Sequence, residues 1–140
     1  VPIRAFYRGY RQTVRCPEEI LTGVRIPVPV EGTRQVFHKV GTRRAQSIAK
    51  VSLACCAYLD GEGRWRNVRI AAGSVAPTPV SLVRTESSLE GCRPSLEAVN
   101  EAASIAESEI RPIDDIRSTG IYRRTIAGRL LRRFLEGFLQ

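Results

Sequence analysis

The feature that most restricts the fold is a pair of segments in the middle of the chain whose side chains alternate with a period of two. The first, residues 51–59 (VSLACCAYL), and the second, residues 65–75 (WRNVRIAAGSV), are separated by the turn-forming sequence DGEGR. Side chains on a strand alternate between two faces, and a short connection containing glycine joins antiparallel strands. We therefore expect a β-hairpin with one face formed by Val51, Leu53, Cys55, Ala57, Leu59, Val68, Ile70 and Ala72.

After this hairpin the hydrophobic period changes from two to 3.6, which indicates helices. Thr78 followed by Pro79 is typical of a helix start and predicts a helix through about Leu89. Ser95 is the expected cap of a second helix, and Ser118 or Thr119 that of a third. The apolar stripes of these two helices are Leu96, Val99, Ala103, Ala106 and Ile110, and Ile126, Ala127, Leu130, Leu131, Phe134, Leu135 and Phe138. Strands followed by helices predict an α+β fold, with a small antiparallel β-sheet of about three strands and about three helices packed on one face.

The chain before the hairpin carries weaker signals. Residues 34–40 (RQVFHKV) predict a short strand that Gly41 ends. Residues 20–30 (ILTGVRIPVPV) are rich in β-branched side chains but contain two prolines, which lack an N–H donor, so we expect an edge strand at most. Residues 1–19 show no sustained period and predict a surface lead-in. The two faces of the short strand are Val36, His38 and Val40 on one side, and Phe37 and Lys39 on the other.

Histidine and cysteine are too sparse for most catalytic or metal chemistry. His38 is the only histidine, and the four cysteines contain no C-x-x-C pair. Cys55 and Cys56 are neighbours in a predicted strand and point to opposite faces, so we expect free thiols and a reducing, cytoplasmic setting. The chain also lacks a G-x-S-x-G, a P-loop and a G-x-G-x-x-G motif. We predict no metal site and no catalytic residue in this chain, and no segment approaches the roughly 20 apolar residues of a membrane span.

The net charge of +8 predicts an anionic partner. In the basic stretch KVGTRRAQSIAK, residues 39–50, Gly41 permits a tight turn, Arg43 and Arg44 can pair with phosphate or carboxylate, and Ile48 offers an apolar surface to a flat ring. The residues alone favour a solvated basic loop over a binding loop. An interaction module for nucleic acid or an acidic protein is the alternative function. The arginine-rich last helix could lie on a membrane or a partner, but its apolar stripe favours a place in the core.

Five stretches, in order along the chain, together resemble one family: FYRGYRQTVRCPEEILTGVRIP, FHKVGTRRAQSIAKVS, VRIAAGSVAPTP, EIRPIDDIRST and YRRTIAGRLLRR. The family is the C-terminal part of the FAD-binding subunit of xanthine dehydrogenase and its relatives, including the carbon monoxide dehydrogenase flavoprotein. The resemblance covers nearly the whole chain. It implies that residues 1–31 close the FAD-binding domain proper and that residues 32–140 form the separate C-terminal domain, which covers one side of the flavin.

The resemblance also implies a set of cofactor-binding residues. Leu21 matches a family residue that lines the FAD site, and Lys39 matches a lysine that contacts the flavin. The loop from Val40 to Lys50, which contains Arg43 and Arg44, resembles the mobile segment beside the isoalloxazine ring, with Ile48 next to the ring. Animal members carry acidic residues in this loop, where this chain has Ala45, Gln46 and Ser47.

The implied system is a molybdenum hydroxylase with several partners. In this family a molybdenum cofactor oxidises a purine or related heterocycle, 2Fe-2S clusters on partner subunits or domains carry the electrons, and FAD passes them to NAD. The family's glycine-rich segments for the FAD pyrophosphate precede the matched region, and this sequence starts at Val1 and contains no methionine. We therefore expect a piece of a longer protein that by itself is inactive and binds FAD weakly or not at all, with no nucleic acid and no membrane as partner.

Overall fold

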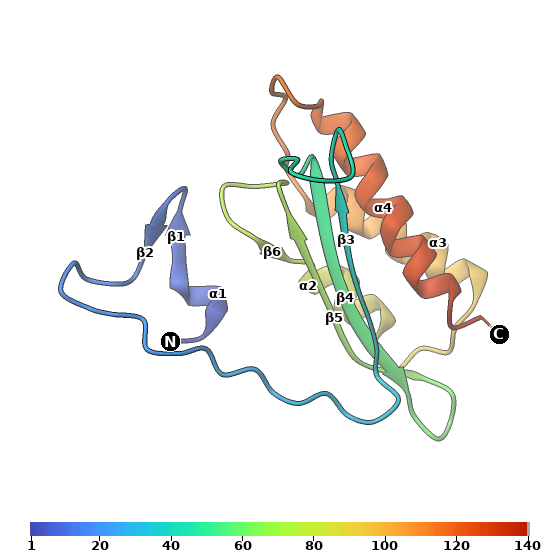
Figure 1. The fold of residues 1–140 in the computed structure, drawn as a ribbon. Coiled ribbons are helices and arrows are strands. Elements are labelled where there is room, and N and C mark those ends of the chain that lie inside the picture. Colours follow the sequence, from blue (N-terminus) through green and yellow to red (C-terminus); the bar gives the residue numbers. More distant parts are fainter. Residues whose placement is uncertain (140) are drawn as a thin grey trace.

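The structure is a computed structural model that describes residues 1–139, and its main body is a four-stranded antiparallel sheet (Figure 1). The strands neighbour one another in the order of the sequence. They are β3 (Arg34–Val40), β4 (Val51–Leu59), β5 (Trp65–Gly73) and β6 (Val80–Ser81). β4 and β5 form the predicted hairpin, and the carboxylate of Asp60 orders its turn by accepting backbone N–H groups.

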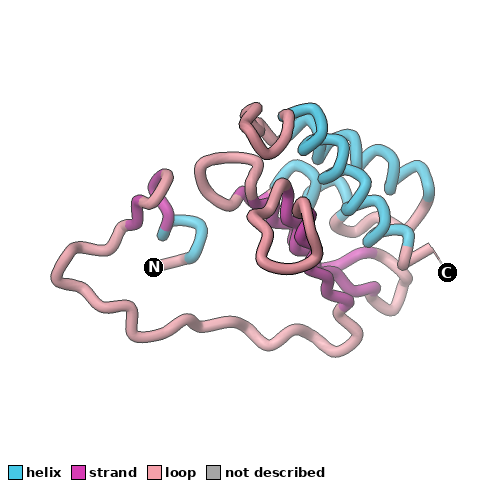
Figure 2. Tube along the Cα trace, turned by 45° about the horizontal axis from the view of Figure 1, so that its top comes forward, coloured by secondary structure: helices cyan, strands magenta, loops and turns pink. Residues whose placement is uncertain are grey.

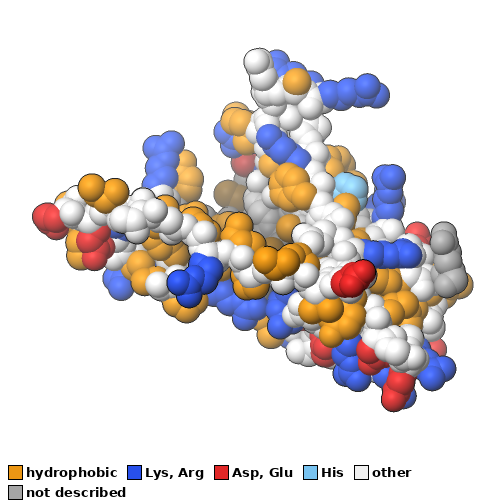
Figure 3. Space-filling model, turned by 60° about the horizontal axis from the view of Figure 1, so that its bottom comes forward, with side chains coloured by type: hydrophobic (Ala, Val, Ile, Leu, Met, Phe, Trp, Pro, Cys, Tyr) orange, Lys and Arg blue, Asp and Glu red, His pale blue; other side chains and the backbone are white. Residues whose placement is uncertain are grey.

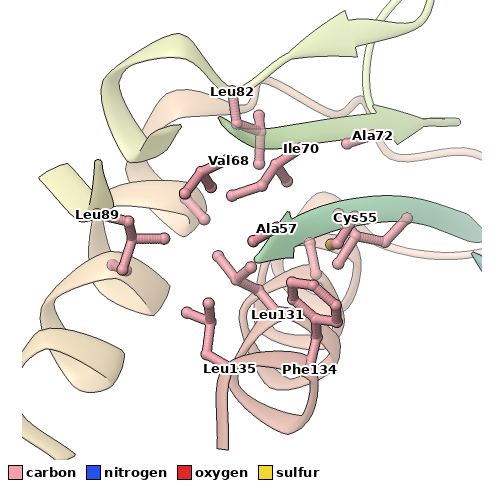
Figure 4. Close-up of a cluster of buried hydrophobic side chains, with 14 of the residues drawn as sticks. Cys55, Ala57, Val68, Ile70, Ala72, Leu82, Leu89, Leu131, Phe134 and Leu135 are labelled. Atoms are coloured by element: carbon pink, nitrogen blue, oxygen red, sulfur yellow. The ribbon is translucent and has the colours of Figure 1, made fainter. Parts of the chain in front are cut away.

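Three helices cover one face of this sheet, as Figures 1 and 2 show from two directions. They are α2 (Val83–Leu89), α3 (Leu96–Glu109) and α4 (Gly120–Glu136). Alternate residues of β4 and β5 point toward the helices and are buried, and leucines and phenylalanines of α4 pack onto them (Figure 4). The prediction of an α+β fold with helices on one face is confirmed. Apolar area removed from water in this layer is the main force that holds the body together.

The starts of the two long helices are confirmed by their caps. Ser95 Oγ accepts the backbone N–H of Ala98 at 3.1 Å, and Thr119 Oγ1 accepts that of Tyr122 at 3.2 Å. Thr119, rather than Ser118, is therefore the cap of α4. The predicted stripe of α3 is wrong at Leu96, which is exposed because it is the first residue of the helix, ahead of the turns that contact the core.

The helix predicted to start at Pro79 is also wrong in its first part. Val80 and Ser81 instead form β6, paired with Ala72 and Ala71 of β5. The backbone N–H of Leu82 then donates to the carbonyl of β5 residue Ile70 at 2.9 Å, and α2 begins only at the next residue. The open edge of β5 offers backbone partners to this segment, and this long-range pairing overrides the local cap signal.

Residues 1–33 lie to one side of this body (Figure 1). They contain a single helical turn, α1 (Ile3–Phe6), and a small two-stranded sheet, β1 (Tyr7–Gly9) with β2 (Gln12–Thr13). The edge strand expected within residues 20–30 does not form, since its prolines lack donors and no described strand runs beside it. We call residues 20–30 the arm. Figure 3 shows hydrophobic side chains along the N-terminal region, and the exposed ones within the arm are Ile20, Leu21, Val24, Ile26, Val28 and Val30.

Candidate functional site

The basic loop, residues 41–50, connects β3 to β4, and its two ends are held together. The backbone N–H of Lys50 donates to the carbonyl of Val40 at 2.7 Å and closes its base. A Cβ on Gly41 would collide with the side chain of Ser47, so only glycine permits this close approach. Arg43 donates from Nε to the Ala45 carbonyl at 3.0 Å and from Nη2 to the Gln46 carbonyl at 2.9 Å. The loop is therefore internally ordered, and part of the Arg43 guanidinium serves that order.

Ile48 projects from this loop with 65% of its surface exposed, at the mouth of a cavity of about 530 Å³. Three other segments contribute walls: the β1–β2 turn with Tyr10, the β5–β6 connection (residues 74–79), and the α3–α4 loop (residues 110–119). The cavity, called the larger cavity below, is lined mainly by apolar groups. They include Ile48, Val75, Ala76, Pro77, Pro79 and Ile113.

A buried arginine ties two walls of the larger cavity together. Arg123, 4% exposed, donates from Nη1 to the carbonyl of Ser74 at 2.7 Å and from Nη2 to Asp115 Oδ1 at 2.6 Å. Its Nε has no hydrogen-bond partner among the described residues. Ser74 has a positive φ of 63°, a conformation that is costly for a residue other than glycine and that this contact helps to hold. Arg123 thus fixes the β5–β6 connection against the α3–α4 loop.

Asp115 is the centre of the α3–α4 loop. Its carboxylate accepts the backbone N–H of Arg117 at 2.8 Å and that of Ser118 at 3.1 Å, in addition to Arg123. These contacts, first the Arg117 N–H and then the Arg123 side chain, lower the pKa of Asp115 below its ordinary value. Asp115 therefore stays ionised and keeps the loop closed.

Lys39 lies on the open face of the sheet, opposite the helices, at the end of β3. It is exposed, and its cross-strand row continues through Ser52 of β4 to Gly73 of β5. A Cβ on Gly73 would be 2.5 Å from the Ser52 hydroxyl, so Ser52 lies close against this glycine. Lys39 thus stands beside small residues on the open face of the sheet.

The structure brings together only some of the residues predicted for the site. Arg43 and Ile48 line adjoining cavities of the basic loop, and Lys39 precedes this loop on the sheet. Lys39 and Arg44 are both exposed and line none of the cavities described here. Leu21 lies apart from the others, in a separate cavity of about 320 Å³ within the N-terminal region.

The sequence reasoning missed Tyr10, Arg117, Arg123 and Asp115. All four occur in stretches quoted for the family resemblance, but no role was assigned to them. Asp115 lies in the loop before α4 and Arg123 lies in the first turns of α4. An aspartate eight residues before an arginine is only a faint sequence signal for this pairing.

The thiols and the helices of residues 1–139 restrict the chemistry further. Burial raises the pKa of Cys55 to about 12, so its thiol is neutral and unreactive, and all four cysteines are free. The described residues contain no cluster of histidine, cysteine or acidic side chains able to hold a metal ion. None of the described helices is long and apolar enough to cross a membrane.

Comparison with known proteins adds a family and several relatives. The family described as "CO dehydrogenase flavoprotein C-terminal domain" matches residues 36–138. The carbon monoxide dehydrogenase medium chain of Afipia carboxidovorans is 32% identical over 136 residues, which are 97% of this chain and 46% of that protein.

Solved structures of related enzymes also match this chain. Carbon monoxide dehydrogenase from Hydrogenophaga pseudoflava, in a form that lacks the Mo-pyranopterin moiety of the molybdenum cofactor, matches with a TM-score of 0.87 and 28% identity over 95% of this chain and 46% of that one. Quinoline 2-oxidoreductase from Pseudomonas putida 86 matches with a TM-score of 0.81 and 26% identity over 95% and 45%. The chain spans about half the length of the curated relatives it matches.

Proposed function

Because the chain belongs to the family of CO dehydrogenase flavoprotein C-terminal domains, we propose that it shapes the flavin site of an FAD-binding subunit in a molybdenum hydroxylase of the xanthine dehydrogenase type. The family match carries this proposal. The larger cavity supports it, since about 530 Å³ with mainly apolar walls suits a planar ring system, within the range of roughly 300–1,000 Å³ typical of ligand sites.

Within this proposal the predicted residues divide the work. Ile48 provides an apolar contact for one side of the isoalloxazine ring. Lys39, Arg43 and Arg44, none of which lines the larger cavity, supply positive charge from outside its walls. Leu21 contributes to the FAD site through residues 1–31, which we assign to the FAD-binding domain proper, whereas residues 32–140 form the covering domain. The exposed apolar arm of residues 20–30 agrees with a place against that other domain.

The chain's own part in the chemistry is to position the cofactor and to place positive charge near it. FAD, when bound, would take up the electrons that the partner cofactors remove from the substrate and pass them to a second acceptor. Reduction places negative charge on the ring. A lysine ammonium nearby stabilises that reduced, anionic form and therefore raises the reduction potential of the cofactor. The basic loop, through Ile48, would limit the access of water and of the acceptor to a ring held in the larger cavity.

The proposed assembly extends beyond this chain. We assign the molybdenum cofactor and the 2Fe-2S clusters to partner subunits or domains, and NAD to the role of electron acceptor. The description of one relative supports molybdenum chemistry. The matched structure from Hydrogenophaga pseudoflava is a form that lacks the Mo-pyranopterin moiety of the enzyme's molybdenum cofactor. The nature of the oxidised substrate is decided by the partner that carries the molybdenum.

The test of this function is Lys39→Ala in the complete assembly. We expect electron transfer to NAD to fall by about tenfold, the effect of losing about 1.4 kcal/mol of charge stabilisation, and the midpoint potential of the flavin to fall with it. Substrate oxidation with an artificial acceptor that draws electrons before the flavin should be unchanged. Arg129→Ala, which removes an exposed cation from α4, is the matched control. Equal loss of both activities, or an unchanged potential, would refute the role of Lys39.

A further inference from the structure

A second cavity, of about 320 Å³, adjoins Ile48 and brings together three cations. Arg43 and Lys50 come from the basic loop, and Arg117 comes from the α3–α4 loop, more than sixty positions later in the chain. Thr42, Gln46 and Ser47 complete its polar lining, and no acidic residue lines it. We call this site the cationic cavity. Its net positive charge arises only in the folded chain, because separate segments supply it.

The contacts that these cations already make leave their charge incompletely balanced. Among the residues described, no ion pair joins Arg43 or Lys50 to a carboxylate. Lys50 Nζ lies over an aromatic ring of α4, 5.4 Å from its centroid, which is a weak form of stabilisation. Arg117 Nη1 is 3.5 Å from Asp115 Oδ2, but the same carboxylate binds Arg123 at 2.6 Å. One carboxylate is thus shared between two guanidinium groups.

The fold keeps the cationic cavity in shape without a ligand. The contact of Gly41 with Ser47 and the hydrogen bond between Lys50 and Val40 fix the path of the loop. Gln46 has a positive φ of 50°, which is a strained conformation for this residue. Holding three like charges around one space is unfavourable by itself, and an anion that enters the space relieves it. Such preorganised positive groups bind an anion at little further cost in ordering.

We propose that the cationic cavity binds the phosphate group of a phosphorylated small molecule. Arg117 and Nη1 of Arg43, whose Nε and Nη2 already donate within the loop, offer guanidinium N–H donors to phosphate oxygens, and Lys50 adds a point charge. Three cations exceed the charge of a single carboxylate but suit a phosphate dianion, and the hydroxyls of Thr42 and Ser47 can donate to its further oxygens. The exposed side chain of Ile48 forms an apolar wall for the organic part of the molecule. Arg43 and Ile48 are shared with the flavin contacts proposed above, but every residue of the site belongs to this chain, so phosphate binding can be measured without the flavin.

The experiment is a titration of the 15N-labelled chain with inorganic phosphate and, separately, with ADP, at constant ionic strength and followed by amide chemical shifts. Saturable shifts confined to residues 41–50 and 110–119 are expected at millimolar concentrations. Lys50→Ala and Arg117→Ala should each weaken binding by about tenfold, the loss expected for one charged hydrogen bond. Arg129→Ala is the matched control, since it removes an equal charge from an exposed position of α4, outside the cavity. Its affinity should equal that of the wild type.

Two further variants distinguish a loss of charge from a loss of structure. Lys50→Arg keeps the charge and should retain phosphate binding. Gln46→Glu adds a carboxylate to the wall of the cavity and should weaken phosphate binding. Circular dichroism and the emission of Trp65, the only tryptophan, show whether each variant is folded. Equal weakening by Arg129→Ala would reveal diffuse attraction to a basic chain and overturn the proposal, as would the absence of saturable shifts. Tighter binding of ADP than of phosphate assigns the site to a phosphate ester, and equal binding assigns it to the free anion; both outcomes support an oxyanion site.

Discussion

The N-terminal region, residues 1–33, and the body, residues 34–139, use the same apolar residue types in opposite ways. Leu131 of α4 is 0% exposed, whereas Leu21 is 61% exposed. The hydrophobic core contains no residue of the N-terminal region. β-Branched residues in an extended chain are thus not enough to build a sheet: residues 34–40 pair with β4, while residues 20–30 pair with none of the described strands. The comparison indicates that the apolar side chains of the arm belong to a surface that this chain does not itself bury.

The largest difference between the regions is expected in cysteine reactivity. Cys16 is exposed, whereas Cys55 is 4% exposed and its pKa is raised to about 12 by burial. Iodoacetamide at pH 8 should modify Cys16 at least about a thousandfold faster, because Cys55 reacts only when the body unfolds. Mass spectrometry of tryptic peptides over time measures both rates. Cys92, exposed within the body, controls for access of the reagent and should react quickly. Equal rates for Cys16 and Cys55 would show that the body is not closed.

The same substitution in the two regions gives the next largest contrast. Leu131→Ala should lower the free energy of unfolding by about 2–5 kcal/mol, since it removes a buried side chain and leaves a cavity. Leu21→Ala should change it by less than about 0.5 kcal/mol, as is usual for an exposed position. Urea unfolding followed by the fluorescence of Trp65 measures both. A large loss of stability in Leu21→Ala would mean that the arm packs in solution.

Removal of the whole N-terminal region should also change the stability of the body only slightly. A chain that begins at Arg34 keeps every strand of the four-stranded sheet and the whole core. Its thermal midpoint should move by less than about 6 °C, which corresponds to roughly 1 kcal/mol for a domain of this size. Differential scanning calorimetry of the full and shortened chains provides the comparison. If the shortened chain fails to unfold cooperatively, the two regions are not separable.

Local patterns predicted much of the body. The period-two alternation located β4 and β5, and single residues, Ser95 and Thr119, located the starts of α3 and α4. These signals succeed because a cap or an alternation acts over a few neighbouring residues. The signal at Thr78 and Pro79 failed, since a distant strand edge competed for the same backbone and formed β6.

The candidate site was predicted only in part for a similar reason. The sequence showed the density of charge around Arg43 and the exposed apolar position of Ile48, both within one loop. It gave no indication that Arg117 would face the same cavity or that Arg123 would be buried and bound to Asp115. Those relations join residues that are far apart in the chain or on different elements.

The sequence by itself determined which segments alternate, where the long helices begin, how basic the chain is and which family it resembles, because these properties depend on residues close together. Only the tertiary structure decided which edge β6 pairs with, which arginine is buried and which cations share a cavity. The physical reason is that burial, pairing and the balance of charge depend on what lies nearby in space, and the fold alone sets those distances.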